Sequence, residues 1–249
     1  VDVYLQQLGG KPAIYLFSPI EMDALVNLSL VPSWRFSTIY PIVPTKSTAL
    51  SHETLTWNVH VYGDGSLTEK TTGLDVAYLY WEAHTNSDAP PSPPPSPLPG
   101  QNASIEHFCP NSSDLDDHNA VVLPVASLTP YLDKALKSLG LHTEARTSFI
   151  TYWLPSFLKH NHIALRFVPQ AAYERAAPLD ISPAPAVSTR VFMLFKGVCE
   201  GNLDLWQEAQ ARADDDVAMW RDVVGVDIEK ASDETLFRVL EWGGMEVLR

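Results

Sequence analysis

The stretch TLTWNVHVYGDGSLTEK, residues 54–70, contains a long strand, a tight turn and the start of a second strand. Successive residues of a strand point to opposite faces of its sheet. The apolar residues from Leu55 to Val61 therefore share one face, whereas the polar residues between them, including His60, face solvent. The sequence Gly63-Asp64-Gly65 has the backbone freedom of a tight hairpin. The stretch predicts two antiparallel strands with one buried face.

Four more runs before residue 88 are rich in β-branched and aromatic residues and are separated by turn residues. Strands this close together predict an antiparallel sheet or a sandwich of roughly five to seven strands. The runs are AIYLFS (13–18), ALVNLSLV (24–31), RFSTIYPIV (35–43) and LDVAYLYWEA (74–83).

A helical period replaces the strand period after residue 127. Apolar residues recur at helical spacing over 128–139, with Thr129 as the expected N-cap and Gly140 as the stop. A second helix is expected to follow almost at once, with Thr143 as its N-cap, and Pro155 should kink or end it because proline lacks an amide donor. The sequence therefore predicts a pair of consecutive helices.

The whole chain predicts an α+β fold in three parts. These are a β-rich part over 1–87, a proline-rich and acidic surface loop over 88–118, and an α+β part over 119–249. Strands resume at 162–168, 177–182 and 188–198, and a last strand is expected to turn at Gly243-Gly244. We expect these strands to complete the sheet of the first part, so that the chain forms one interlocked globular unit.

The proline-rich loop has two interpretations. Proline removes the amide donors that helices and sheets need, so residues 88–104 should be a loop. Proline-rich segments also dock in aromatic grooves of partner proteins. Nothing basic flanks these prolines, which favours a plain surface insertion over a protein-binding motif.

Charge and composition exclude several classes of partner and cofactor. The chain has 30 acidic and 17 basic residues and a formal charge of −13, which repels phosphate backbones and anionic lipids. Nucleic acids and membranes are therefore not expected partners. The acidic region over 200–234 is interpreted as a solvated face. The sequence has no phosphate-cradling glycine loop, and we expect no cofactor.

The cysteines and the first residues suggest a compartment. Cys109 and Cys199 are too few for a disulfide framework, and two reduced thiols are expected. The start, VDVYLQQLGGKP, lacks the basic and apolar parts of a secretory signal. We therefore expect a cytoplasmic protein, or a secreted one if a leader preceded residue 1.

Six motifs occur in order along nearly the whole chain. They are KPAIYLFSP (11–19), TWNVHVYGDGSLTE (56–69), YLYWEA (78–83), LGLHTEARTSFITYWLP (139–155), RVFMLFKGV (190–198) and EWGG (241–244). The chain resembles a family of uncharacterised fungal and bacterial proteins that share K-P-x-I-Y-L-Y/F, D-G-x-L-T, Y-L-x-W-E, Y-W-L-P and E-W-G-G motifs. The resemblance implies no established activity.

Two carboxylates stand beside tryptophan. In YLYWEAH (78–84), Glu82 shares a strand face with Tyr80, whose hydroxyl can hydrogen-bond a carboxylate. The second neighbour pair is Glu241-Trp242. Two carboxylates beside aromatic rings are what a glycoside hydrolase needs, so Glu82 and Glu241 are the candidate catalytic pair. The alternative, which we favour, is that each carboxylate meets an arginine such as Arg190 or Arg238.

A metal site is a weaker hypothesis. His160 and His162 are two residues apart, so a strand would direct both to one side, where they could bind a metal with a third ligand. No third histidine at a fixed spacing supports that site. The alternative is that they end a helix, where histidine benefits from the free carbonyls.

The leading hypothesis is a non-catalytic binding protein with an aromatic-lined cleft for a glycan or a peptide. A helix that breaks beside the sheet could leave a cleft with Trp153 as its floor and Tyr152 as its wall. Tyr80, Glu82 and Arg190 complete the expected lining. The carbohydrate-acting hydrolase is the second hypothesis, and the metal-dependent enzyme is the third.

Overall fold

The computed structural model describes residues 8–48, 52–86, 106 and 108–248. Its helix content of 29% and strand content of 39% confirm the α+β class, with a sheet-rich N-terminal half. Most of the expected proline-rich loop lies outside the described residues. No helix in the described part of the chain is long and apolar enough to cross a membrane.

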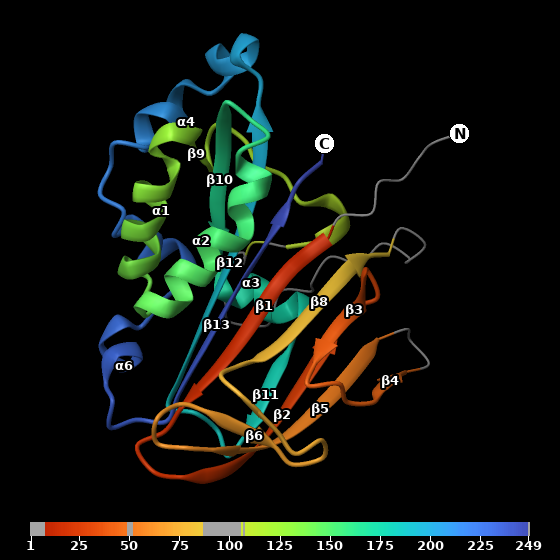
Figure 1. Cartoon of the computed structure of the whole chain (residues 1–249). Coiled ribbons are helices and arrows are strands. Elements are labelled where there is room, and N and C mark those ends of the chain that lie inside the picture. The colour runs from red at the N-terminus through yellow and green to blue at the C-terminus, as the bar shows by residue number, and fades with distance from the viewer. Residues whose placement is uncertain (1–7, 49–51, 87–105, 107, 249) are drawn as a thin grey trace, which may run out of the picture.

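The strands form two sheets (Figure 1). They are β1 (Leu8–Phe17), β2 (Met22–Leu30), β3 (Trp34–Tyr40), β4 (Thr45–Ser47), β5 (Glu53–Val61), β6 (Leu67–Glu69), β7 (Leu74–Val76), β8 (Leu79–Thr85), β9 (Val121–Pro124), β10 (His162–Val168), β11 (Leu179–Ser182), β12 (Val187–Val198) and β13 (Arg238–Glu246). The helices are α1 (Val125–Ser138), α2 (Thr143–Phe157), α3 (Gln170–Ala176), α4 (Gln207–Arg212), α5 (Met219–Val224) and α6 (Ile228–Ser232), with short 3₁₀ turns η1 (Pro110–Ser112) and η2 (Glu200–Leu205).

Strands from both halves of the chain share the larger sheet. Its seven strands have the order β3-β8-β1-β13-β12-β10-β9, and all neighbours are antiparallel except β12 and β13. Strand β1 pairs with β13 along most of its length, which joins the two ends of the chain. The smaller sheet has the order β11-β2-β5-β6-β7, with β4 paired to β5.

Each face of the seven-stranded sheet supports its own core. Ile14 and Leu16 of β1 join the core between the two sheets, whereas Ala13 and Tyr15 join the core under the helices. This alternation follows from the two-residue period of a strand. The predicted face of β5 is confirmed, because Trp57 and Val59 are fully buried in the core between the sheets.

The two predicted helices are present with different details at their ends. Helix α1 begins at Val125, four residues before the expected cap Thr129, so Pro130 lies inside the helix. Helix α2 begins with Thr143 itself, so the cap position is one residue earlier than expected, at His142. Pro155 lies inside α2, which ends two residues later at Phe157.

The expected turn at Gly243-Gly244 is wrong, because β13 continues through both glycines. A Cβ atom at Gly243 would lie 3.0 Å from the Pro12 side chain. At Gly244 it would lie 3.0 Å from the carbonyl oxygen of Met193 and 3.1 Å from the Trp153 ring. The glycines therefore allow neighbouring groups to approach β13 closely. Glycine in a strand often marks either a bend or such a close approach, and here it marks the close approach.

Candidate functional site

The outer surface of β3 and β8 carries accessible aromatic and polar side chains beside Tyr80 and Glu82, two of the predicted site residues. Helix α1 lies over β9 and β10, helix α2 lies over β13, and β8 and β3 lie to one side of both helices (Figure 1). In the antiparallel register, residues directly opposite each other project from the same face. Three cross-strand pairs make up this surface, which we call the open face: Arg35 with His84, Thr38 with Glu82, and Tyr40 with Tyr80.

Residues of the open face remain accessible. Tyr40 is 46% exposed, and Arg35, Thr38 and His84 are also exposed. Tyr80 and Glu82 are half-buried. Their neighbours on the strands, such as Trp81, point the other way into the core between the sheets. The surface therefore presents aromatic rings beside groups that donate and accept hydrogen bonds.

Glu82 is held by two tyrosines. The hydroxyl of Tyr152, on α2, donates a hydrogen bond of 2.7 Å to Oε1 of Glu82, and the hydroxyl of Tyr80 also bonds this carboxylate. Burial and then the bond to Glu82 raise the pKa of both tyrosines, so both remain protonated donors at neutral pH. The structure thus brings together three of the residues predicted for the cleft.

Trp153 and Arg190 lie away from the open face. Trp153 is 5% exposed, and its ring packs edge-on against Phe195 in the core under the helices. Arg190 is 3% exposed and lies on the opposite side of the sheet from Tyr152, in the region between the two sheets. The expected cleft that combines Arg190 with Tyr152 is therefore not formed by these residues.

Glu241 is also buried in the region between the sheets. It is fully buried, and its Oε2 accepts a hydrogen bond of 2.5 Å from Nε of Arg190. Its Oε1 accepts bonds from the Trp81 indole at 3.0 Å and from the Tyr173 hydroxyl at 3.3 Å. The sheet separates Glu241 from Glu82, so the geometry does not assemble the carboxylate pair that hydrolysis would need. The favoured alternative, in which each carboxylate meets an arginine, therefore holds for Glu241, whereas Glu82 is bonded by tyrosine and forms no ion pair with an arginine of the described residues.

His160 and His162 do not form a metal centre with other described residues. Nε2 of His160 lies 3.2 Å from Oε1 of Glu246, and His162 begins β10. No group of three or more His, Cys, Asp or Glu side chains within the described ranges is placed to hold a metal ion. The alternative interpretation, in which both histidines end a helix, is not met either, because α2 ends at Phe157 and His162 is already in β10.

A row of rings leads from β8 toward the start of α2. Tyr78, just before β8, lies 5.2 Å from Tyr15 between ring centroids, and Tyr15 lies 6.1 Å from Phe17. The His142 ring meets Tyr15 and Phe17 edge-on, at 5.0 and 5.5 Å. The Tyr15 hydroxyl donates a bond of 2.9 Å to Glu144. Burial lowers the pKa of His142, which keeps its ring neutral at neutral pH.

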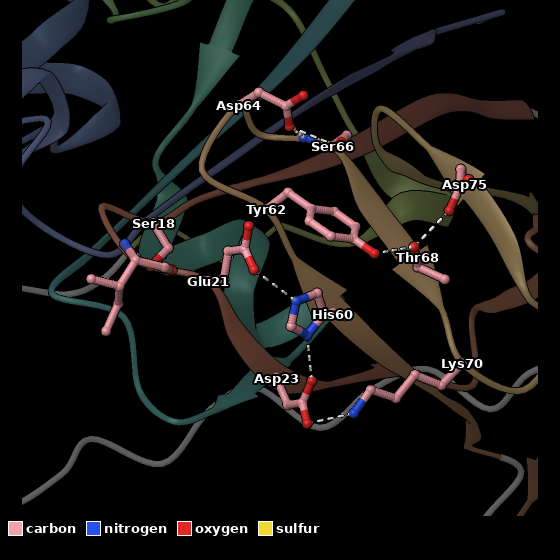
Figure 2. Close-up of polar contacts among 11 residues, drawn as sticks. Ser18, Glu21, Asp23, His60, Tyr62, Asp64, Ser66, Thr68, Lys70 and Asp75 are labelled. Atoms are coloured by element: carbon pink, nitrogen blue, oxygen red, sulfur yellow. Dashed lines mark hydrogen bonds and ion pairs between the residues drawn. The ribbon is translucent and has the colours of Figure 1, made fainter.

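Apart from the open face, a polar hollow lies at the smaller sheet, around the predicted hairpin (Figure 2). Nδ1 of His60 lies 2.7 Å from Asp23, which also pairs with Lys70 at 2.5 Å. Asp64 accepts bonds from the amide and the hydroxyl of Ser66, and these bonds lower the pKa of Asp64. These acidic groups are engaged within their own turn and strands, so the hollow is explained as a stabilised hairpin.

Sequence reasoning missed the half of the open face that β3 supplies. The register of β3 against β8 shifts between Phe36 and Thr38, which indicates a bulge. Strict alternation from Arg35 places Tyr40 on the opposite face from Arg35, whereas the bulge returns it to the same face. The nearest signal in the sequence was the aromatic content of RFSTIYPIV. It predicts a strand, but it does not predict which residues of the strand face which side of the sheet.

Comparisons with family models, with curated proteins and with solved structures found no match for this chain. The resemblance of its motifs to the fungal and bacterial family stays a prediction. The function therefore has to be argued from the open face itself.

Proposed function

We propose that the protein is a non-catalytic glycan-binding protein and that the open face is its binding surface. The observation that carries the proposal is the cross-strand pair of Tyr40 and Tyr80 beside Glu82. A sugar ring has a face of C–H groups that packs on an aromatic ring and an edge of hydroxyls that needs hydrogen bonds. Tyrosine provides an apolar face and a polar tip in one side chain.

The polar groups of the open face match sugar hydroxyls. Each carboxylate oxygen has two lone pairs, so Glu82 can accept bonds from a ligand in addition to those from Tyr152 and Tyr80. Arg35 donates from an adjacent position along the strands, and Thr38 both donates and accepts. The face thus offers donors and acceptors next to its pair of rings along the strands.

The site is built on strands, which favours binding without rearrangement. Tyr80 and Glu82 lie on β8, which is paired on both sides, by β1 and by β3. Tyr152 also anchors Glu82 from the helix layer. A ligand that meets side chains already held in place loses less conformational entropy on binding.

A peptide fits the open face less well. Peptides bind sheets mainly by adding a strand to an exposed edge, where backbone groups supply the affinity. The bulge in β3 interrupts the edge strand on this side of the sheet. The accessible features of the open face are side chains, which favours a glycan.

A glycan array followed by calorimetry with the best-binding oligosaccharide tests the proposal. We expect Tyr40→Ala to weaken binding about threefold to tenfold, because one ring–sugar contact is lost. Tyr62→Ala, on the smaller sheet, is the matched control and should bind like the wild type. Glu82→Gln should weaken binding, whereas Glu21→Gln, an exposed carboxylate in the hairpin hollow, should not.

Two outcomes count against the proposal. One is a blank array with protein that is folded by circular dichroism. The other is binding that survives Tyr40→Ala and Glu82→Gln but is lost in Tyr62→Ala, which would move the site to the smaller sheet.

A further inference from the structure

A cavity of about 230 Å³ lies where the helix-covered face meets α6, apart from the open face. Phe17 of β1 and Val239 and Leu240 of β13 form apolar walls, and Arg238 and Glu234 supply opposite charges. Figure 1 shows α6 beside the first residues of β13. The cavity is therefore built from segments that are distant in sequence.

Arg238 forms no ion pair within the described residues, although its charge adds to the bonds from Thr235 that lower the pKa of Asp233. Its Nη1 donates a bond of 2.8 Å to the carbonyl of Ala231, and its guanidinium lies 5.5 Å from the centre of the Phe17 ring. Its Nε is buried and has no hydrogen-bond partner in that same set of residues. None of the ion pairs formed there includes Arg238. The half-buried guanidinium therefore has a donor that is left unsatisfied, and a ligand anion beside it would be stabilising.

The neighbouring acidic residues do not form an ion pair with Arg238, although the chain carries 30 acidic residues. Asp233 accepts bonds at its Oδ1 from the amide and the hydroxyl of Thr235, at 2.9 and 2.6 Å. Glu234 lines the cavity but is not within ion-pair distance of Arg238. A cation and a carboxylate thus face one cavity without pairing with each other.

The size and walls of the cavity restrict its occupant further. Sites for drug-sized ligands have volumes of about 300–1,000 Å³, so this occupant is smaller. Thr189, which is 3% exposed, adds a hydroxyl to the lining, and His142 adds an aromatic edge. The apolar walls favour a short hydrocarbon side chain, and the two opposite charges favour a zwitterion.

We propose that this cavity binds a free α-amino acid with an apolar side chain, whose carboxylate pairs with Arg238 and whose ammonium group pairs with Glu234. The side chain lies against Phe17 and Leu240. The proposal does not depend on glycan binding, because no residue of the open face lines the cavity.

Thermal-shift and calorimetric titrations with apolar L-amino acids, from alanine to phenylalanine, test the proposal. We expect at least one of them to raise the melting temperature of the wild-type protein. The amide of that amino acid lacks the carboxylate, and its N-acetyl form lacks the ammonium group. Each derivative should bind about tenfold more weakly or worse, because one charge-assisted contact is lost.

Two charge variants and their controls assign the contacts. Arg238→Gln should weaken binding of the free amino acid about tenfold or more, whereas Arg175→Gln, at an exposed arginine of α3, should not change it. Glu234→Gln should remove the preference for the free amino group. Glu229→Gln, at an exposed carboxylate of α6, should keep that preference.

Ala231→Met tests the cavity while it keeps the Arg238 side chain and the backbone carbonyl to which Arg238 donates. The longer side chain should fill the cavity and abolish binding, even if Arg238→Gln proves too unstable to measure. The proposal is overturned if none of the amino acids shifts the melting temperature at millimolar concentration. It is also overturned if the blocked derivatives bind equally well, or if Ala231→Met binds like the wild type.

Discussion

The two neighbour pairs of tryptophan and glutamate have opposite orientations in the sheet. In β8, Trp81 points into the core between the sheets, and Glu82 points to the open face. In β13, Glu241 points into the region between the sheets, and Trp242 points to the core under the helices. The indole of Trp81 donates its hydrogen bond to Glu241, so the two pairs meet through the buried members.

This difference shows that the face of the sheet to which a glutamate points decides whether its carboxylate can reach a ligand. Glu82 is half-buried, is bonded by tyrosine hydroxyls and keeps acceptor capacity for a ligand. Glu241 has no exposed surface and is neutralised by Arg190. A charge buried in this way needs a partner, because its desolvation penalty is several kcal/mol. One glutamate can recognise a ligand, and the other belongs to the core.

The largest expected effect on the free energy of unfolding concerns the buried pair of Glu241 and Arg190. Arg190→Met leaves Glu241 without its cation and should lower the free energy of unfolding by about 3–5 kcal/mol, measured by urea denaturation. Glu82→Gln changes a half-exposed carboxylate and should cost less than about 1 kcal/mol.

A double variant separates the lost ion pair from lost packing. Arg190→Met combined with Glu241→Met removes both charges of the buried pair and should be more stable than Arg190→Met alone, because the other anionic partner of Arg190, Glu174, has a side chain that is 45% exposed and stays hydrated. The single variant Glu241→Met is measured as well. If the double variant loses as much free energy of unfolding as the two single variants together, the ion pair does not stabilise this part of the core.

A smaller effect is expected on the exposed side. Tyr152→Phe removes the bond of 2.7 Å to Glu82 and should lower the free energy of unfolding by about 1 kcal/mol. Tyr62→Phe is the matched control, because its hydroxyl bonds the neutral Thr68 at 3.1 Å near the hairpin. That change should cost less than about 0.5 kcal/mol. Equal losses in the two variants would mean that Glu82 gains little from Tyr152.

Local periodicity made part of this comparison predictable. The alternation in YLYWEAH placed Tyr80 and Glu82 on one face and Trp81 on the other, because the strand period is the same wherever the strand lies. The α+β class followed from the change of period after residue 127 for the same reason. Both predictions needed only neighbours in the sequence.

Predictions that depended on partners from other strands were less successful. Tyr40 reaches the open face only through the bulge in β3, and periodicity does not reveal a bulge. The turn expected at Gly243-Gly244 is absent because Pro12 and Trp153 pack close to β13 there. The Arg238 cavity joins segments whose contacts depend on the whole topology. Each of these features is set by packing between distant residues.

The smallest effect concerns two histidines in contrasting environments. Burial lowers the pKa of His142, whereas the bond to Glu208 raises the pKa of the exposed His118. Below about pH 6.5 the unfolded chain protonates both rings. The folded protein resists this protonation at His142, so the contribution of His142 is intact above that pH and is lost as the pH falls. The contribution of His118 is present below that pH and is lost as the pH rises through its raised pKa.

Urea midpoints of His142→Gln and His118→Gln, measured from pH 5 to pH 8, should therefore separate from the wild type in opposite directions. The wild type should lose stability relative to His142→Gln as the pH falls, and relative to His118→Gln as the pH rises. Both differences should be small, because the His142 side chain is 41% exposed and water screens charges at such positions. Curves that run parallel to the wild type in both variants would show that neither ring senses its surroundings. The contrast between buried and exposed groups would then be limited to the carboxylates.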